Sequence, residues 1–272
     1  MQTPNSVRHL DNAIRRVVGQ DNYMGVRTLL ANAIVAHLLP DGVVKGGSSL
    51  KLRYGDNVTR FTTDLDTARK VDIEQFTRDL TATLEEGWCD FTGRVVIGKQ
   101  ARPKEVPTQY VMQPLNVKLS YLQKPWCSVL LEVGHNEIGD AEIADYVVPK
   151  EANGYFEKLG FETLPAIPLM RLEYQIAQKL HGLSEQGGNR LNDLIDLQLI
   201  ICNSDIDLIK VNNICRHLFD YRGQQKWPPA ISKTETWSDI YETQSDGVDV
   251  FKNIDDALDW VNELIDNISE AI

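Results

Sequence analysis

Residues 46–66 read GGSSLKLRYGDNVTRFTTDLD and link a glycine turn to two closely spaced aspartates. The β-branched pair Val43-Val44 before the turn predicts a short strand, and Gly46-Gly47 followed by two serines predicts a tight turn into a helix. A second β-rich stretch, from Val58 to Thr67, predicts a strand that carries the aspartates. The segment therefore predicts a strand, a helix and a second strand in close succession, which is typical of a mixed α/β or α+β lobe.

The two aspartates, Asp64 and Asp66, are two residues apart, so an extended strand points both carboxylates to one face and Leu65 to the core. Two adjacent carboxylates repel each other, and a divalent cation between them removes the repulsion. The glycines of the turn let backbone N–H groups approach a ligand, and Ser48 begins the following helix, where the dipole favours phosphate. Either motif alone indicates only a turn or a polar surface, whereas their order and spacing indicate a metal site beside a phosphate site.

Glu132 is an unusual charge within a predicted strand. It is a lone charge in the apolar strand sequence Val129-Leu130-Leu131-Glu132-Val133, and a charge in such a setting needs a compensating partner. The alternative is that Glu132 lies on an exposed face of its strand.

The rest of the chain divides into a mixed part and a helical part. A proline-punctuated hinge, Leu164 to Pro168, precedes the second part. Hydrophobic periodicity predicts helices at 5–18, 23–39, 73–84, 172–183, 191–201, 206–219 and 254–268, and strands at 95–97, 111–121 and 127–133. We therefore predict an α+β (mixed α/β) fold with a mixed sheet in residues 1–160 and a mostly helical lobe with an acidic tail in residues 161–272.

The composition excludes several classes of protein. No apolar run in the 272 residues approaches the roughly 18 needed to span a bilayer, and the N-terminus lacks the apolar core of a signal peptide. The four cysteines are far apart, without the pairs typical of zinc sites or disulfide frameworks. These observations predict a cytoplasmic protein without a membrane partner.

The formal net charge of −11 is confined to the second half of the chain. Residues 1–150 hold 18 basic and 18 acidic residues, whereas 234–272 hold eleven acidic residues and Lys252 alone. The hydrophobic spacing within the acidic tail predicts an amphipathic helix with a buried stripe, formed by Ile254, Leu258, Val261, Leu264, Ile265 and Ile268. The alternative is a tail that contacts a basic partner or shields the basic stretch described next.

One stretch, residues 94–124, is basic. Its charged residues are Arg94, Lys99, Arg102, Lys104, Lys118, Lys124 and a single acid, Glu105. Together with Tyr110, Tyr121 and Trp126 it predicts a surface that grips an RNA backbone and stacks exposed bases. Strand edges protected by basic side chains are the alternative.

At this point a family resemblance becomes visible. Residues 46–66 resemble the nucleotidyltransferase signature, Gly-[Gly/Ser], a helix, then Asp-x-Asp on a strand. More narrowly, this motif and the later segment 164–197, LPAIPLMRLEYQIAQKLHGLSEQGGNRLNDLIDL, are similar to AbiEii/AbiGii-type (MenT-like) toxins of type IV toxin–antitoxin systems. The resemblance covers residues 45 to 200 and implies a polymerase-beta-like nucleotidyltransferase lobe followed by a helical lobe.

The resemblance also implies roles for individual residues. Asp64 and Asp66 would hold Mg²⁺, joined by Glu132, although the family often has aspartate at that third position. Gly46, Gly47 and Ser48 would contact the triphosphate, Lys179 would reach the active site, and Asp193 would position Lys179 or the acceptor. Arg60, Arg190 and Asp196 would support them. From spacing alone, Lys179 is equally a structural lysine bordering the core, and Arg190 with Asp193 a surface pair.

The implied activity is the Mg²⁺-dependent transfer of a nucleoside monophosphate from an NTP to a hydroxyl, most simply the 3′ end of tRNA, which blocks translation. One metal would activate the acceptor and bridge the α-phosphate, and a second would neutralise the leaving pyrophosphate. The expected partners are an NTP, tRNA and a cognate antitoxin, and the expected state is a monomer. Two alternatives remain: a protein or small-molecule acceptor, and a non-catalytic nucleotide-binding interaction protein.

Overall fold

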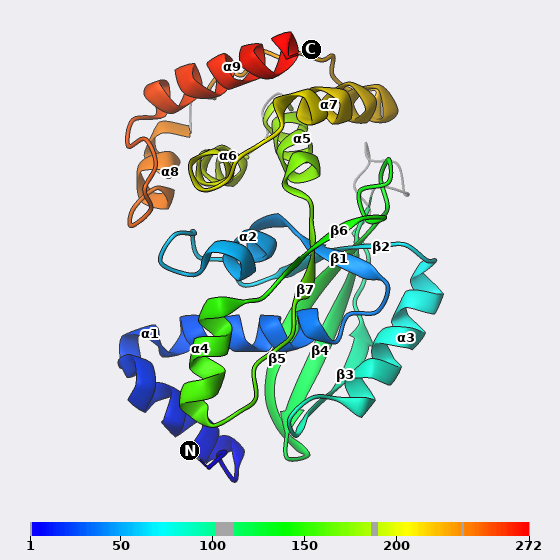
Figure 1. Ribbon diagram of the computed structural model, residues 1–272, viewed down its shortest axis with the longest axis vertical. Helices are drawn as coiled ribbons and strands as arrows, with labels where there is room; N and C mark the ends of the chain where they lie inside the picture. Colours follow the sequence, from blue (N-terminus) through cyan, green and yellow to red (C-terminus); the bar gives the residue numbers. More distant parts are fainter. Residues whose placement is uncertain (1, 102–110, 186–189, 235–236, 272) are drawn as a thin grey trace. The chain divides into compact units, whose positions relative to one another are not determined.

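A mixed β-sheet organises the first part of the chain (Figure 1). The structure is a computed structural model that describes residues 2–101, 111–185, 190–234 and 237–271. Within these ranges seven strands pair in the order β3-β4-β5-β2-β1-β7-β6. They are β1 (Gly42–Lys45), β2 (Leu65–Arg69), β3 (Phe91–Ile97), β4 (Gln113–Tyr121), β5 (Lys124–His135), β6 (Ala144–Val147) and β7 (Ile167–Met170).

The centre of the sheet is mixed in direction, which confirms the predicted fold class. Strand β2 runs antiparallel to β1 and parallel to β5, while β1 runs parallel to β7. Alternate residues of β2 and β5 face opposite sides. Leu65 and Leu131 are fully buried on the core side, whereas Asp66 and Glu132 point to the other side and are partly exposed.

Four described helices belong to the same unit as the sheet: α1 (Val7–His37), α2 (Gly46–Tyr54), α3 (Ile73–Glu86) and α4 (Lys150–Leu159). Helix α1 contains one non-helical residue, Gly19, with φ 80° and ψ 170°. The two helices predicted at 5–18 and 23–39 therefore meet at a kink. Side chains of Ser6 and Asp72 cap α1 and α3 by accepting backbone N–H groups of the first turn.

The second compact unit is helical. The chain divides into a unit of residues 1–55 with 61–170 and a unit of residues 56–60 with 171–272. The helices described in the second unit are α5 (Leu172–Leu183), α6 (Leu191–Asn203), α7 (Leu208–Arg222), α8 (Trp237–Gln244) and α9 (Ile254–Glu270). Helix α5 packs on α6 and α7, and α9 packs on α7 and α8.

The acidic tail folds as an amphipathic helix, as its spacing predicts. The stripe of α9 is buried in the second unit, through Ile254, Ala257, Leu258, Val261, Leu264, Ile265 and Ile268. Asn253 caps the helix by accepting the N–H of Asp255. The hydrophobic stripe thus anchors this segment, and the acidic positions lie on the remaining faces.

Two expectations about the strands are wrong. Strand β2 begins at Leu65 rather than at Val58, because residues 56–60 pack with the second unit and residues 61–64 carry no ladder. The predicted hinge at 164–168 contains the start of β7, which pairs with β1 and β6. Prolines 165 and 168 conceal this strand in the sequence, since proline cannot donate to a ladder.

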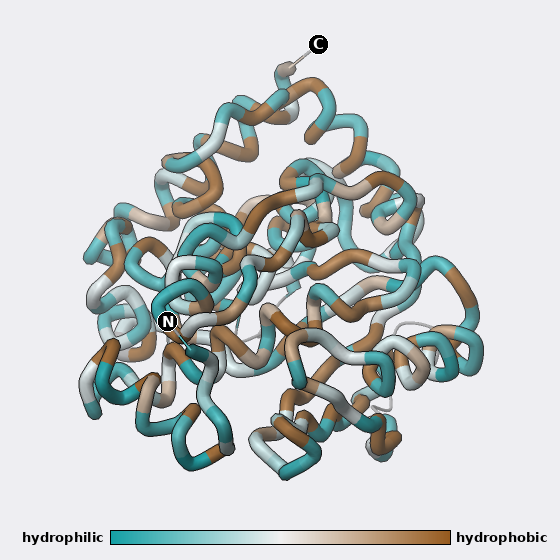
Figure 2. The backbone as a smooth tube through the Cα atoms, turned by 60° about the horizontal axis from the view of Figure 1, so that its bottom comes forward, coloured by the Kyte–Doolittle hydropathy of each residue, from teal (hydrophilic) through white to brown (hydrophobic). Residues whose placement is uncertain are grey.

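Hydrophobic and hydrophilic positions alternate along the helices and strands (Figure 2).

Across the described residues, no helix combines the length and the apolar character that a membrane crossing requires. The four cysteines are free thiols.

Candidate active site

The turn between β1 and α2 fits tightly against an aspartate. Gly46 has φ +66°, a left-handed conformation that favours glycine. A Cβ at this position would also overlap the carboxylate of Asp66. Backbone geometry and close approach therefore both require glycine here, and the turn brings the first residues of α2 against the aspartate pair.

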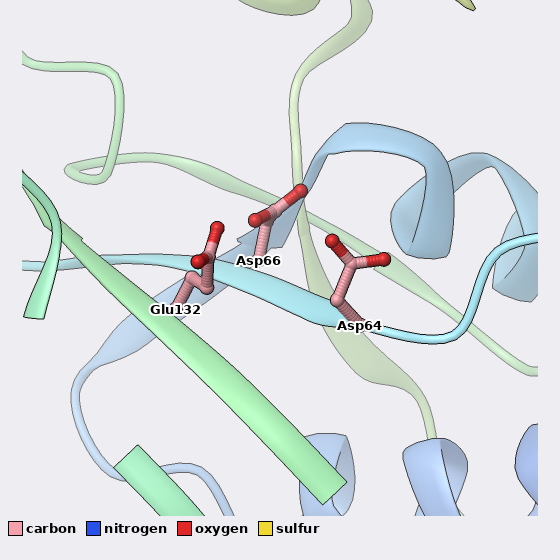
Figure 3. Close-up of side chains that lie close together, drawn as sticks. All are labelled: Asp64, Asp66 and Glu132. Carbon is pink, nitrogen blue, oxygen red and sulfur yellow. The ribbon is translucent and has the colours of Figure 1, made fainter. Parts of the chain in front are cut away.

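Three carboxylates converge on the side of the sheet opposite Leu65 (Figure 3). Asp66 and Glu132 are directly opposite each other on β2 and β5, and Asp64 lies just before β2. One oxygen from each carboxylate lies within 4.8 Å of the others, and all three residues are partly buried. Carboxylate oxygens in such a cluster are the ligands that Mg²⁺ and similar hard cations prefer.

Ser48 links the glycine turn to the aspartates. Its side chain is 2% exposed, and its hydroxyl donates a hydrogen bond to the backbone carbonyl of Asp64. The hydroxyl of Thr62 donates to Asp64 Oδ1 at 3.1 Å. These bonds hold the segment before β2 in place, and a contact of Ser48 with a triphosphate stays a prediction.

The charges in this cluster are not balanced. Burial raises the pKa of Glu132 above its usual range, the nearby Asp64 carboxylate raises it further, and Lys45 opposes both. The ionised form of Glu132 is therefore disfavoured in the metal-free protein. A divalent cation would offset the repulsion between the carboxylates and stabilise the ionised form of Glu132. The donor set therefore fits a metal site.

Glu132→Gln is expected to raise the melting temperature of the metal-free protein slightly at neutral pH, because it removes the disfavoured charge. A raised pKa destabilises the folded state as pH rises through it, so the gain should vanish below about pH 4, near the ordinary pKa of glutamate. Thermal melts in EDTA at several pH values measure this. In Mg²⁺ the order should reverse, with wild type stabilised more than the variant; an equal Mg²⁺ shift in both would contradict a role in metal binding.

A second charged cluster lies within the helical unit. Lys179 of α5 places its ammonium 3.0 Å from Asp193 Oδ1 and 2.6 Å from Asp196 Oδ2, both on α6. Arg60 binds Asp196 with two hydrogen bonds, at 2.9 and 3.0 Å. The structure thus brings together four of the residues that the sequence nominated, because segment 56–60 packs with this unit.

Burial and pairing compete in this cluster. Burial of Lys179 opposes its charge, but Asp196 and Asp193 outweigh that effect and raise its pKa. Burial likewise acts against ionised Asp196, yet Lys179 and Arg60 lower its pKa below the usual range. Lys179 and Asp196 thus stay charged at neutral pH. Arg190 is different, since its guanidinium lies 3.9 Å from Glu185 and both side chains are more than half exposed.

The prediction that aromatic residues of the basic stretch stack exposed bases is wrong for two of them. Tyr121 is fully buried and Trp126 is 6% exposed, and both pack against Phe91 in the core. Neither ring is accessible to an RNA base. Tyr110, Arg102 and Lys104 lie outside the described residues, while Arg94, Lys99 and Lys124 are exposed.

One charged residue beside the three carboxylates was not expected from the sequence. Lys45 ends β1 directly opposite Asp66 and is only 8% exposed. Its position in the sequence could have revealed it. A lysine at the end of an apolar strand, just before a glycine turn, is an unusual residue for a buried position.

Residues 27–271 match the family described as nucleotidyl transferase AbiEii toxin of type IV toxin–antitoxin (TA) systems. Among solved structures, the fold is similar to MenT4, a nucleotidyltransferase toxin from Mycobacterium tuberculosis H37Rv, with 15% identity, a TM-score of 0.52 and coverage of 95% of this chain and 97% of that one. JHP933 from Helicobacter pylori also matches, with 12% identity, a TM-score of 0.45 and 91% of each chain covered. No curated protein matches the chain.

Proposed function

The chain belongs to the AbiEii family of nucleotidyl transferase toxins of type IV TA systems, and we propose that it transfers a nucleoside monophosphate from an NTP to the 3′-terminal hydroxyl of tRNA, with release of pyrophosphate. The observation that carries this proposal is the carboxylate triad beside the glycine turn. Transfer to a tRNA end would block aminoacylation and so halt translation.

We assign the binding of Mg²⁺ to Asp64, Asp66 and Glu132. When bound there, Mg²⁺ supplies positive charge to the α-phosphate and to the attacking oxygen. The turn at Gly46 and Gly47 brings the N-terminal end of α2 to the triad, where backbone N–H groups favour phosphate oxygens. Ser48 fixes the turn against Asp64 through its hydroxyl.

In the helical unit, we assign the phosphate contact to Lys179. Asp193 and Asp196 occupy two of the three N–H donors of its ammonium and so fix its direction. Among the described residues no further group accepts from this ammonium, which leaves one donor for a phosphate oxygen. Arg60 holds Asp196 and thereby supports this arrangement, while Arg190 stays a candidate for contact with the acceptor.

The direct test is incubation of the purified chain with Mg²⁺, total tRNA and each NTP in turn, labelled on the α-phosphate. We expect label on RNA with one or more NTPs, and none when the label is on the γ-phosphate, since pyrophosphate leaves. EDTA and the double variant Asp64→Asn with Asp66→Asn should abolish labelling. Transfer of γ-label would contradict the reaction proposed.

The same experiment distinguishes tRNA from a protein or a small molecule as the acceptor. Label on a protein or small molecule, with none on tRNA, would overturn the tRNA assignment and keep the transferase. Growth arrest by the double variant would point to a non-catalytic interaction protein. Family membership also leads us to propose a cognate antitoxin as partner and the cytoplasm, where tRNA and NTPs reside, as the site of action; the monomeric state is tested by light scattering.

A further inference from the structure

A lysine lies in the same row as the metal-binding acids. Lys45 of β1 is opposite Asp66 of β2, which is in turn opposite Glu132 of β5. Residues that are directly opposite in neighbouring strands point to the same face of a sheet. Lys45 therefore shares a face with the carboxylates, and only 8% of its surface is exposed.

The ammonium of Lys45 lies where a side chain at position 134 would be, because that residue is glycine. Ala68 and Gly134 are opposite each other, two residues beyond Asp66 and Glu132 along their strands. A Cβ on Gly134 would lie 3.1 Å from Lys45 Nζ and 3.7 Å from its Cε. The lysine thus extends across β2 to β5, with its ammonium on the side of Glu132 away from Asp64.

None of the described protein groups binds this ammonium. Within the described ranges, the Lys45 side chain takes part in no hydrogen bond and no ion pair, and its charge acts on Glu132 only through space. Lys179 offers the contrast, because two carboxylates hold its ammonium at 3.0 and 2.6 Å. The Lys45 side chain is largely buried, and within the described ranges no protein group takes up the donors of its ammonium, so these donors remain for a ligand.

The position of Lys45 in the chain points to an anion. Lys45 is the N-cap residue of α2, it makes no side-chain cap, and the first turn of α2 contains no acidic residue. Asp, Asn, Ser and Thr are the favoured residues at this position, and a positive charge there opposes the helix dipole. Two sources of positive potential are therefore placed side by side next to the metal ligands.

We propose that Lys45 is a substrate-binding residue whose ammonium donates to a non-bridging oxygen of the NTP polyphosphate while Asp64, Asp66 and Glu132 hold the metal. The inference rests on the proposed function and deepens it. Metal-bound phosphate is the anion that this row of residues would bring within reach of Lys45, because the metal ligands and the lysine share one face of three adjacent strands.

The test uses Mg²⁺-tripolyphosphate, which has the three linked phosphates common to every NTP and needs no knowledge of the base. Its dissociation constant is measured by titration calorimetry on the full chain. We expect Lys45→Met to weaken binding by about tenfold or more, the range for hydrogen bonds to charged groups. Gly134→Ala keeps the charge but makes the ammonium give way by a few tenths of an ångström, and should weaken binding by a smaller factor.

Lys70→Met is the matched control. Lys70 lies just beyond β2 and its exposed ammonium is 3.7 Å from Asp41, so its loss should leave the dissociation constant unchanged. If Lys45→Met lowers the melting temperature but binds as tightly as wild type, the lysine is structural and the inference is overturned. If that variant does not fold, unchanged binding by Gly134→Ala overturns it instead.

Different results would overturn the role of Lys45 and the metal site of the proposed function. Binding that is lost in Asp66→Asn and unaffected by the Lys45 and Gly134 variants would overturn the role of Lys45 and leave the metal site intact. A wild-type chain that does not bind Mg²⁺-tripolyphosphate, or binds it equally well without Asp66, would overturn both.

Discussion

Asp66→Asn is expected to reduce the rate of nucleotide transfer by about a thousandfold or more. Asp66 is at the centre of the triad, opposite both Lys45 and Glu132 and in contact with the turn at Gly46. Metal-bound charge stabilisation contributes several kcal/mol to such a transition state, and each 1.4 kcal/mol or so is a factor of ten in rate. Asparagine keeps the shape that Gly46 accommodates, so the fold should persist.

The measurement is the initial rate of α-label transfer at saturating Mg²⁺, with circular dichroism as the check on folding. Asp41→Asn is the control, since its exposed carboxylate, 72% accessible, lies near Lys70 and away from the triad row. We expect wild-type rates from Asp41→Asn. A rate within tenfold of wild type for folded Asp66→Asn would remove Asp66 from the metal site.

Asp196→Asn should destabilise the helical unit by about 3–5 kcal/mol, the cost of removing one partner from a buried ion pair. Asp196 is 1% exposed and is the shared counter-charge of Lys179 and Arg60. The variant leaves two cations facing a neutral amide, with Asp193 alone to compensate Lys179. Urea denaturation, monitored through the unfolding transition of the helical unit, measures this loss in the free energy of unfolding.

The pH dependence of this difference has a definite sign. The pKa of Asp196 is lowered in the folded state, so its contribution is complete above the unfolded pKa and is lost as pH falls through the folded value. The gap between wild type and Asp196→Asn should therefore be constant at neutral pH and narrow below about pH 4. Glu185→Gln, which changes the exposed partner of Arg190, should shift stability by less than about 0.5 kcal/mol. A similar small loss for Asp196→Asn would show that the buried cluster contributes little.

The carboxylate triad could be predicted from the sequence because local rules determine most of it. The spacing of Asp64 and Asp66 fixes their common face, and the apolar surroundings of Glu132 single it out. The register that places Glu132 opposite Asp66 is a long-range pairing between strands β2 and β5. No local pattern encodes that pairing, so the family resemblance was needed to join the three residues.

Other features depended on information that a linear pattern does not carry. Arg60 and Asp196 are 136 residues apart, and only packing shows that their charges meet. The aromatic residues Tyr121 and Trp126 look like stacking platforms in a basic stretch, yet both complete the core beside Phe91. Side-chain type alone does not distinguish a ring that is exposed from one that is buried.

The assignment of residues 56–60 to the helical unit has a consequence for any attempt to divide the chain. A fragment that starts at Arg171 contains every helix described for that unit but lacks Arg60, so Asp196 would face Lys179 without its second partner. During synthesis, Arg60 leaves the ribosome long before Asp196 exists, and the helical unit can finish folding only after the sheet-bearing segment between them has been made. Single-cut truncation is therefore expected to yield a weakened helical fragment, and supplying residues 56–60 as a separate peptide should restore part of its stability.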